Sequence, residues 1–354
     1  MKKIILTGGG TAGHVTPNIA LLPLLAAKGY TCVYVGSRDG IERELILKEK
    51  IPYFAISAGK LRRYLDARNV TDLLRVIKGL VEAHGIISRE KPDVIFSKGG
   101  FVAVPVVAAG WLLGVPVVIH ESDITPGLAN RLCAPFAAAI CAGFPETLAA
   151  LPKGKTTLTG TPIRGALFSG DRRRGLAFCG FSADRPVALV MGGSSGAVSI
   201  NNCVRAALPN LLRRYQVAHI CGRGNLDDSQ CPGRAQFEYL SDELPHVLAA
   251  ADVVVSRAGA NAISEFLALR KPALLIPLPK RVSRGDQILN AESFKRQGFG
   301  KVLYEGQLTP ETLMDELEDL YRRRDAFARG MERGAEDAAA AVVRVIAENT
   351  RQRG

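Results

Sequence analysis

The sequence predicts an α/β protein with two Rossmann-like domains, each built on a parallel sheet. Apolar, strand-like runs alternate with segments of helical period along the whole chain, which is typical of βαβ units. The two halves also open alike, with KIILTGGGTAGH in the first and VALVMGGSSGAVS in the second. A length of 354 residues favours two domains. Two such sheets are expected to face one another across a cleft, with ligands at the carboxyl ends of the strands.

In the first half, the apolar runs predicted as strands are KIILT, CVYVG, DVIFS, VPVVIH and AAAICA. The stretch 101–119 carries no charged side chain and has the apolar composition of a membrane span, but two glycines and two prolines interrupt it. We therefore expect a helix that ends near Leu113, with Gly114 as its C-terminal cap, followed by a buried strand. A bilayer span needs about 20 uninterrupted apolar residues.

In the second half, the predicted strands are PVALVMGG, VAHICG, DVVVS and PALLIP. Between the two sets lies TLTGTPIRGALF, which is rich in Gly, Thr and Pro and is followed by a charged run at 171–174. This change of composition predicts an N-terminal domain over 1–160 and a C-terminal domain over 161–354. The last helix is a candidate to pack back on the N-terminal domain.

The composition indicates a globular protein with an acidic partner. Hydrophobic residues make up 47% and charged residues 23%, which excludes a disordered chain. The formal net charge of +12 points to nucleic acid, a phosphorylated ligand or an anionic membrane surface. Seven cysteines without a CxxC pair argue against a disulfide framework and fit a reducing cytosol. The N-terminal apolar run is too short for a signal peptide.

The first glycine-rich turn, Gly8–His14, follows a strand and opens a helix. Glycines allow close approach of an anion, and a helix N-terminus supplies N–H groups. Gly8, Gly10 and Gly13 match GxGxxG, the dinucleotide fingerprint. The acid expected after the second strand is replaced by GSR, so an NADP enzyme that uses Arg38 stays open, as does a turn without a ligand. The Walker A lysine pattern is missing.

Other chemically capable side chains follow strands farther along the chain. His14 could orient a phosphate or act as a general base, or be merely structural. HESD, at 120–123, follows a buried strand, although Asp123 or Thr125 could instead cap the next helix. In SRAGANAISE, Glu265 lies a turn or more into a helix, where a carboxylate can accept two hydrogen bonds from a ribose diol. Gln287 could bind sugar hydroxyls or be solvated.

Seven segments together resemble the bacterial cell-wall glycosyltransferases of family 28: GGGTAGHVTP, SKGGFVAVPV, HESDITPGLAN, GTPIR, GGSSGA, SRAGANAISE and DQILNA. They cover nearly the whole chain, and GGTxGH with a later SRxGA…SE is far more specific than a lone GxGxxG. The resemblance implies a GT-B fold, with the active site between two Rossmann-like domains. It also implies inverting transfer of N-acetylglucosamine from UDP-GlcNAc to the 4-hydroxyl of the N-acetylmuramoyl group of lipid I. The products are lipid II, for peptidoglycan synthesis, and UDP.

The resemblance also assigns residues. It places Thr11, Ala12 and Gly13 near the donor diphosphate and sugar. It gives His14 a role either as the general base or in binding the acceptor. The donor positions in the second half are Arg164, Ser194, Ala260, Asn261, Ala262, Ile263, Ser264, Glu265 on the ribose, and Gln287 on the sugar. Asp123 is a further predicted UDP-GlcNAc-binding position. It stands where some members have Asn, and an ionised Asp can accept but cannot donate a hydrogen bond in its contact with the sugar.

No metal and no cofactor are expected. GT-A enzymes stabilise the leaving diphosphate with a metal held by a DxD motif, and no DxD follows a strand in this sequence. Helix N-termini are expected to do this instead, which fits the glycine-rich turns.

A lipid acceptor would account for the basic charge. Residues 60–91 hold eight Lys or Arg against four Asp or Glu. Within them, apolar residues recur at helical spacing beside Arg75 and Lys78, namely Leu73, Leu74, Ile77, Leu80 and Val81. An amphipathic helix of this kind can rest on anionic lipid, although a core-facing helix with a solvated basic side has the same pattern. Trp111–Leu113 is a second candidate patch. The resemblance favours peripheral binding at the cytoplasmic face of the membrane, with no nucleic acid.

Three alternative functions stay open. Another lipid-directed GT-B transferase, such as a diacylglycerol galactosyltransferase, would not account for the HESD and DQILNA segments. An NADP oxidoreductase would leave the second glycine-rich turn and SRAGANAISE unexplained. A non-catalytic nucleotide-binding module that recruits a membrane partner is the third.

Overall fold

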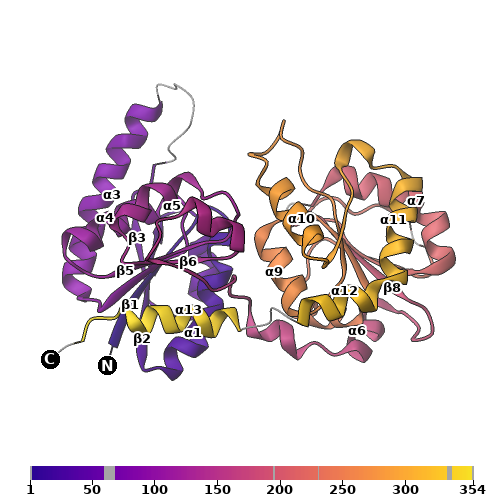
Figure 1. Cartoon of the computed structure of the whole chain (residues 1–354), viewed down its shortest axis with the longest axis horizontal. Coiled ribbons are helices and arrows are strands. Elements are labelled where there is room, and N and C mark those ends of the chain that lie inside the picture. The colour runs from indigo at the N-terminus through magenta and orange to yellow at the C-terminus, as the bar shows by residue number, and fades with distance from the viewer. Residues whose placement is uncertain (1, 60–67, 194–195, 230, 333–336, 353–354) are drawn as a thin grey trace. The chain divides into compact units, whose positions relative to one another are not determined.

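The computed structural model describes residues 2–59, 68–193, 196–229, 231–332 and 337–352, with only the backbone described for 68–73. The chain divides into two compact units. Unit 1 comprises Met1–Arg164 and Glu336–Gly354, and unit 2 comprises Gly165–Ala335. Each unit holds one parallel sheet with helices on both of its faces (Figure 1). Both units therefore have the doubly wound α/β architecture that the sequence predicts.

The described part of unit 1 contains a seven-stranded sheet in the order β3-β2-β1-β4-β5-β6-β7. Its strands are β1 (Lys2–Thr7), β2 (Tyr30–Ser37), β3 (Tyr53–Ile56), β4 (Val94–Ser97), β5 (Val117–Glu121), β6 (Ala139–Ala142) and β7 (Thr156–Leu158). All neighbouring strands pair in parallel. The strand order reverses between β1 and β4, and an open α/β sheet binds ligands at the carboxyl edge beside such a point.

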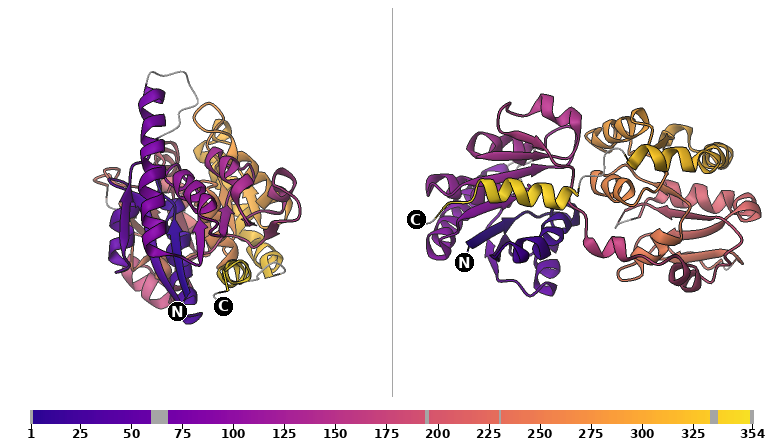
Figure 2. Two further views of the ribbon diagram at one scale, coloured as in Figure 1. Left: turned by 90° about the vertical axis from the view of Figure 1, so that its left-hand side faces the viewer. Right: turned by 60° about the horizontal axis from the view of Figure 1, so that its bottom comes forward.

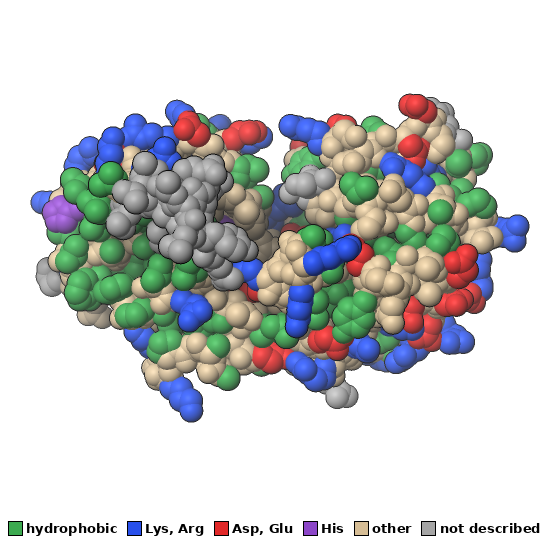
Figure 3. Space-filling model, turned by 90° about the horizontal axis from the view of Figure 1, so that it is seen from above, with side chains coloured by type: hydrophobic (Ala, Val, Ile, Leu, Met, Phe, Trp, Pro, Cys, Tyr) green, Lys and Arg blue, Asp and Glu red, His purple; other side chains and the backbone are tan. Residues whose placement is uncertain are grey.

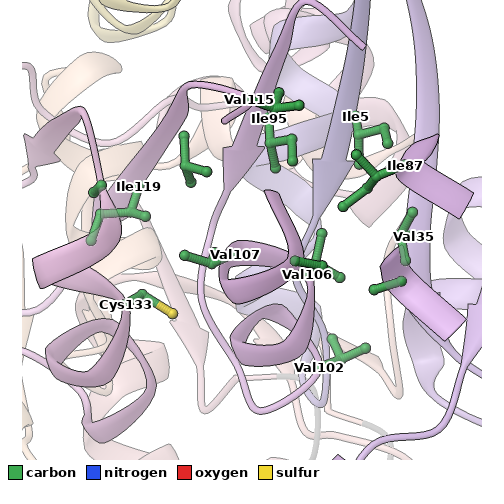
Figure 4. Close-up of a cluster of buried hydrophobic side chains, with 14 of the residues drawn as sticks. Ile5, Val35, Ile87, Ile95, Val102, Val106, Val107, Val115, Ile119 and Cys133 are labelled. Carbon is green, nitrogen blue, oxygen red and sulfur yellow. The ribbon is translucent and has the colours of Figure 1, made fainter. Parts of the chain in front are cut away.

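Helices bury both faces of this sheet. They are α1 (Thr16–Ala27), α2 (Ile41–Lys48), α3 (Arg68–Glu90), α4 (Ala103–Leu112), α5 (Leu128–Cys133) and α13 (Ala338–Glu348), with 3₁₀ turns η1 (Ala12–His14), η2 (Ala134–Phe136) and η3 (Pro145–Ala150). On one face, Val106 and Val107 of α4 pack against Ile5, Ile95 and Ile119 of neighbouring strands (Figure 4). On the other face, α13 packs beside α1 (Figures 1 and 2).

The apolar stretch 101–119 forms a helix and a strand, as expected. Helix α4 ends at Leu112, and Gly114 follows with φ 64°, the left-handed conformation that terminates many helices. Strand β5 then runs buried through the sheet. Among the residues that the structure describes, none of the helices has both the length and the apolar character that crossing a membrane requires.

The described part of unit 2 contains a six-stranded parallel sheet in the order β10-β9-β8-β11-β12-β13. Its strands are β8 (Val187–Met191), β9 (Gln216–Ile220), β10 (Arg234–Phe237), β11 (Val253–Ser256), β12 (Ala273–Leu275) and β13 (Gly300–Val302). Its helices are α6 (Arg172–Cys179), α7 (Val198–Arg214), α8 (Leu244–Ala250), α9 (Ala260–Ala268), α10 (Asp286–Arg296), α11 (Pro310–Arg322) and α12 (Arg324–Met331), with 3₁₀ turns η4 (Gly165–Ser169) and η5 (Glu305–Gln307). Its main core lies between the sheet and α7 and α11.

Candidate active site

The first glycine-rich turn lies at the carboxyl end of β1, as predicted. Gly10 has φ 85°, and the 3₁₀ turn η1, which contains Ala12 and Gly13, precedes α1. The hydroxyl of Thr11 is exposed, and its Oγ1 atom lies 3.0 Å from Nδ1 of the half-buried His14. This contact orients the imidazole at the strand end. Thr11 and His14, which the sequence predicts as site residues, are therefore neighbours.

A buried carboxylate that sequence reasoning missed holds this turn. Glu42 of α2 is fully buried. Its carboxylate accepts hydrogen bonds from the Gly10 N–H at 3.1 Å and from the N–H and hydroxyl of Ser37 at 3.0 and 2.5 Å. A Cβ at Gly9 would lie 2.4 Å from Glu42 Oε1, so this position requires glycine.

Glu42 changes the interpretation of the GxGxxG match. In a dinucleotide site, the glycine-rich turn receives the pyrophosphate and an acid binds the ribose. Here a protein carboxylate from the chain itself accepts the Gly10 N–H, and it is inaccessible to a ribose. The turn is thus built around an internal carboxyl group, which argues against the NADP alternative.

The second turn of unit 1, at 98–100, packs directly on the first. Gly100 has φ 85°, and a Cβ there would lie 2.3 Å from the Gly9 carbonyl oxygen. Lys98 is buried, and its Nζ donates to the hydroxyl of Ser122. Burial lowers the Lys98 pKa to about 8, against the opposing effect of the Glu121 and Asp123 carboxylates. Lys98 belongs to the SKGGFVAVPV segment, but the sequence pattern alone assigns it no role.

The HESD segment ends β5 and turns toward α5. His120 is fully buried, and its Nε2 donates to the Gly160 carbonyl at 2.8 Å. Burial, together with the charge of Lys98, holds the His120 pKa well below its usual value, so the ring is neutral. Asp123 is half-buried, and its carbonyl accepts from the Thr147 hydroxyl at 3.1 Å.

Glu121 organises the turn that contains Asp123. Its carboxylate accepts from the N–H groups of Asp123 and Gly127, both at 2.9 Å, and from the Asn130 side-chain amide at 3.0 Å. Burial raises the Glu121 pKa, and these hydrogen bonds oppose that change. Helix α5 begins at Leu128 with Gly127 as its N-cap, so the alternative of capping by Asp123 or Thr125 is wrong. The carboxylate of the preceding strand orders this turn instead.

In unit 2, the turn after β8 leads into α7. A Cβ at Gly196 would lie 2.1 Å from the Cys221 carbonyl oxygen, so glycine lets the turn approach the end of β9. Helix α7 begins at Val198 without a side-chain cap. Ser194, the predicted donor-binding residue of this turn, lies outside the described residues.

Arg257, at the end of β11, is a second functional candidate that sequence reasoning missed. Its guanidinium donates to the Ile276 carbonyl at 3.1 Å and to Ser199 Oγ at 2.9 Å, and it pairs with Glu305 at 2.5 Å. It thereby joins the ends of β11 and β12 to α7 and η5. The arginine within SRAGANAISE was the available signal, but its partner Glu305 lies 48 positions away in the sequence.

Helix α9 carries the predicted nucleotide-binding segment. It starts at Ala260, after the N-cap Gly259, which makes no side-chain cap. The six predicted residues of this segment divide into two groups: Ala260 and Ile263 are buried, whereas Asn261, Ala262, Ser264 and Glu265 are half-buried. The Ser264 hydroxyl donates to the Ala260 carbonyl at 2.9 Å, so the polar groups that the helix presents after β11 are its first backbone N–H groups and the Glu265 carboxylate. The Ile263 side chain belongs to the core.

Gln287 and Arg164 have different environments. Gln287 is the second residue of α10, and its Oε1 accepts the Leu278 N–H at 3.1 Å, so it holds the loop after β12. The next turn of α10 supplies the fully buried Asn290, which donates to the Ala258 carbonyl at 3.3 Å. Arg164 is half-buried, and its Nε is buried without a hydrogen-bond partner among the described residues.

Comparison with known proteins agrees with this geometry. The glycosyltransferase family 28 N-terminal domain matches residues 4–142, and the family 28 C-terminal domain matches residues 187–345. A UDP-N-acetylglucosamine–N-acetylmuramyl-(pentapeptide) pyrophosphoryl-undecaprenol N-acetylglucosamine transferase of Lachnoclostridium phytofermentans is 56% identical, over 98% of this chain and 99% of its own. The transferase of the same name from Clostridium kluyveri is 53% identical, with the same coverage.

Solved structures show the same fold. The crystal structure of Acinetobacter baumannii MurG matches with a TM-score of 0.76 and 25% identity, over 98% of this chain and 100% of that one. The glycotransferase of kitacinnamycin matches with a TM-score of 0.73 at 18% identity, over 99% of both chains, which shows the fold alone. The two parallel sheets thus form a GT-B fold. On the family matches to both halves and its close relatives, the chain belongs to glycosyltransferase family 28.

Proposed function

We propose that the protein transfers N-acetylglucosamine from UDP-GlcNAc to lipid I, forming lipid II with inversion at the anomeric carbon. The observation that carries this proposal is the identity of 53–56%, over nearly the full length, to transferases whose names state the sugar that is transferred and its lipid-linked acceptor. The inversion is expected from the family resemblance. The site residues add support, because they lie at the carboxyl edges of both sheets, where open α/β sheets bind ligands. The transfer is a single displacement, which needs a proton acceptor and stabilisation of the leaving diphosphate.

Donor binding is assigned mainly to unit 2. Helix α9 begins without a side-chain cap, so its first N–H groups and dipole suit a diphosphate. The half-buried Glu265 carboxylate is a partner for the ribose hydroxyls. Arg257 and Gln287 hold the loops around this helix and so fix the shape of the nucleotide site. Arg164 and Ser194 are retained as donor residues on the resemblance of their motifs.

The acceptor chemistry is assigned to unit 1. The Thr11 hydroxyl, 3.0 Å from Nδ1, orients the His14 ring at the end of β1. A neutral imidazole can take a proton from the acceptor hydroxyl as the sugar is transferred. Ala12 and Gly13 beside it, and Asp123 in the turn after β5, are retained as contacts to the UDP-GlcNAc donor on the resemblance of their motifs. His14 is therefore our candidate for the base.

The lipid part of the acceptor is assigned to an exposed surface of unit 1. On α3, the side chains of Leu74, Ile77 and Val81 are 62%, 51% and 68% exposed, and Arg75 and Lys78 are exposed beside them. Figure 2 shows α3 extending beyond the sheet. Leu80 packs against the core, and the side chain of Leu73 lies outside the described part of the chain. The apolar stripe is thus largely solvent-facing.

A second exposed group lies on the neighbouring helix. Trp111 and Leu112 of α4 are 53% and 59% exposed, and the Trp111 ring lies 5.0 Å from that of Phe136. Helices α3 and α4 pack against each other. Figure 3 shows hydrophobic and basic side chains next to each other over unit 1, on the left. Apolar side chains with a basic flank fit shallow, reversible binding to the anionic inner leaflet.

Turnover with defined substrates tests the proposal. Purified protein is incubated with UDP-GlcNAc and a lipid I analogue, and UDP release is measured. Parallel reactions contain diacylglycerol with UDP-galactose, or a reducible substrate with NADPH. The proposal requires UDP release that depends on UDP-GlcNAc and the lipid I analogue together. Turnover only in one of the parallel reactions would contradict it.

A further inference from the structure

Lys98 connects three neighbouring strand ends of unit 1. Its backbone N–H donates to the Thr7 carbonyl of β1 at 2.9 Å. Its stem lies against the first glycine-rich turn, where a Cβ at Gly8 would be 3.1 Å from Lys98 Cβ. Its ammonium donates to the Ser122 hydroxyl, just after β5. The side chain, only 2% exposed, therefore spans from the turn that leads to His14 to the turn that contains Asp123.

Two carboxylates and two neutral groups act electrostatically on the ammonium of Lys98 or are affected by it. The carboxylates belong to Glu121 and Asp123, whose charges favour the protonated lysine. The neutral groups are His120, with its strongly lowered pKa, and the Cys141 thiol of β6, whose pKa burial raises to about 12. An unpaired buried ammonium is strongly disfavoured, so these carboxylates are what keep the charge there.

The two carboxylates have different surroundings. Glu121 is buried, and three donors of its own turn hold its carboxylate. Asp123 is half-buried and lies in the turn that meets substrate under the proposed function. A change in the charge of Lys98 therefore affects the turn of Ser122 and Asp123, which is the part of this region that is accessible to substrate.

We propose that Lys98 is a positioning residue for the transfer reaction. Its ammonium compensates the Asp123 carboxylate and holds the Ser122–Asp123 turn in register with the turn that carries His14. This inference rests on the proposed function, because the turn matters only if it receives a sugar substrate. Loss of the proton from Lys98 leaves a neutral amine that can still donate to Ser122, but it removes the positive charge that compensates the carboxylates. The active enzyme is therefore the one with protonated Lys98.

The pH dependence of kcat tests this role. The Lys98 pKa of about 8 predicts that kcat of the parent falls as pH rises through that value. In Lys98→Arg the side chain stays charged, so the fall near this pH disappears. In Asp123→Asn the pKa of Lys98 decreases, because a favourable negative charge is lost, and the fall moves to lower pH. Lys98→Met should lower kcat roughly tenfold or more at neutral pH, because it removes both the donor to Ser122 and the buried positive charge.

Unit 2 supplies a matched control. Burial also lowers the pKa of Lys271 to about 8, but its Nζ donates to the Ala249 and Ala251 carbonyls before β11, at the opposite edge of the sheet from the site. Lys271→Met should leave the pH profile of kcat unchanged. A pH profile of Lys98→Arg identical to that of the parent would overturn the proposal.

Two further outcomes are distinguishable. If Lys98→Met does not fold, Asp123→Asn provides the test instead: a fall of kcat at lower pH supports the role of Lys98, and an unmoved profile contradicts it. Absence of turnover in the parent would instead contradict the proposed function. Thermal unfolding of every variant at the assay pH separates loss of fold from loss of positioning.

Discussion

The carboxyl edges of the two sheets use the same strand–turn–helix pattern in different ways. In unit 1, the ionisable groups behind the turns are almost fully enclosed: Glu42, Lys98 and Glu121 are 0%, 2% and 5% exposed. In unit 2, Asn261, Ser264 and Glu265 of α9 are half-buried and accessible from solvent. Arg257 is the enclosed charge there, with Glu305 as its partner. One edge is therefore fixed from within, whereas the other presents its polar groups outward.

A glycine-rich turn alone therefore does not identify an anion site. The Gly10 N–H of the first turn donates to Glu42, a carboxylate of the chain itself. The α9 N-terminus has no side-chain cap, so its N–H groups suit an external anion. Helix α1 also begins without a side-chain cap, so the assignment of the donor mainly to unit 2 rests on Glu265 and the other polar residues of α9 as well.

The largest expected effect is a loss of stability at the carboxyl edge of the unit 1 sheet, where the ionisable groups are enclosed. Glu42→Ala leaves the Gly10 N–H and both Ser37 donors without their acceptor. Gly10 is exposed and Ser37 is half-buried, so water replaces part of each lost hydrogen bond, and each loss costs about 1–2 kcal/mol. We expect the free energy of unfolding of unit 1 to fall by about 3–5 kcal/mol. Trp111, the single tryptophan of the chain, lies in unit 1, so its fluorescence during urea unfolding reports on this unit.

Glu44→Ala is the matched control on the same helix. Glu44 is exposed and pairs with Lys48 one turn away, so its loss should change stability by about 0.5 kcal/mol or less. Equal midpoints of urea unfolding for Glu42→Ala and the parent would contradict this account of unit 1, because the first turn would then not depend on its internal carboxylate.

The next largest effect concerns the carboxyl edge of the unit 2 sheet, where the polar groups of α9 are accessible from solvent. Glu265→Ala should weaken UDP binding by about 1–3 kcal/mol, the usual loss for a hydrogen bond to a charged group. Calorimetry with UDP measures this change. Glu311→Ala, which removes an exposed carboxylate from α11 of the same unit, should leave UDP affinity as it is. If Glu265→Ala binds UDP with unchanged affinity, the proposal that α9 binds the donor nucleotide is contradicted.

A substitution on the exposed surface of α3 should have a smaller effect, in this case on binding to anionic vesicles. Lys78→Glu should weaken binding to anionic vesicles by about 1 kcal/mol or slightly more, because each basic side chain near such a surface contributes about 1 kcal/mol. Binding of the parent should also weaken as salt is raised, because salt screens these charges. Lys295→Glu makes the same charge change on exposed α10 of unit 2 and should not affect co-sedimentation. Equal losses in both variants would show that net charge, rather than α3, drives binding.

The smallest expected effect is that of metal removal. The sequence lacks a DxD motif after a strand, and the proposed donor site uses a helix N-terminus for the diphosphate. We expect EDTA to change the transfer rate by less than about twofold, within the normal spread of assays. An enzyme that EDTA inactivates, and that Mg²⁺ or Mn²⁺ alone restores, would show that the α9 terminus is not sufficient.

Sequence reasoning predicted the interior of both sheets and missed their edges. The predicted strands correspond to β1, β2, β4, β5 and β6 of unit 1 and to β8, β9, β11 and β12 of unit 2. The four missed strands, β3, β7, β10 and β13, are the outermost strands of the two sheets. They are three or four residues long and partly exposed, so they lack the continuous apolar run that marks a strand buried on both faces.

The candidate site was predictable where function depends on local pattern. Thr11 and His14 are close in sequence, and their contact follows from one turn. Glu42 and Gly10 are 32 positions apart, so their hydrogen bond depends on how α2 packs. The burial of Lys98 likewise requires three strand ends to meet. Long-range packing of charged groups has no signature in the spacing of one sequence.

The stereochemistry of the product is a direct test of inverting transfer to lipid I. Protein, UDP-GlcNAc and a lipid I analogue are allowed to react to completion, and the new glycosidic linkage is determined by NMR while UDP is quantified. The proposed inverting transfer predicts a β-linked N-acetylglucosamine on the 4-hydroxyl of the muramoyl sugar, with one UDP released for each linkage formed. An α-linkage, a linkage at another hydroxyl, or release of UDP without a glycosylated lipid would contradict it.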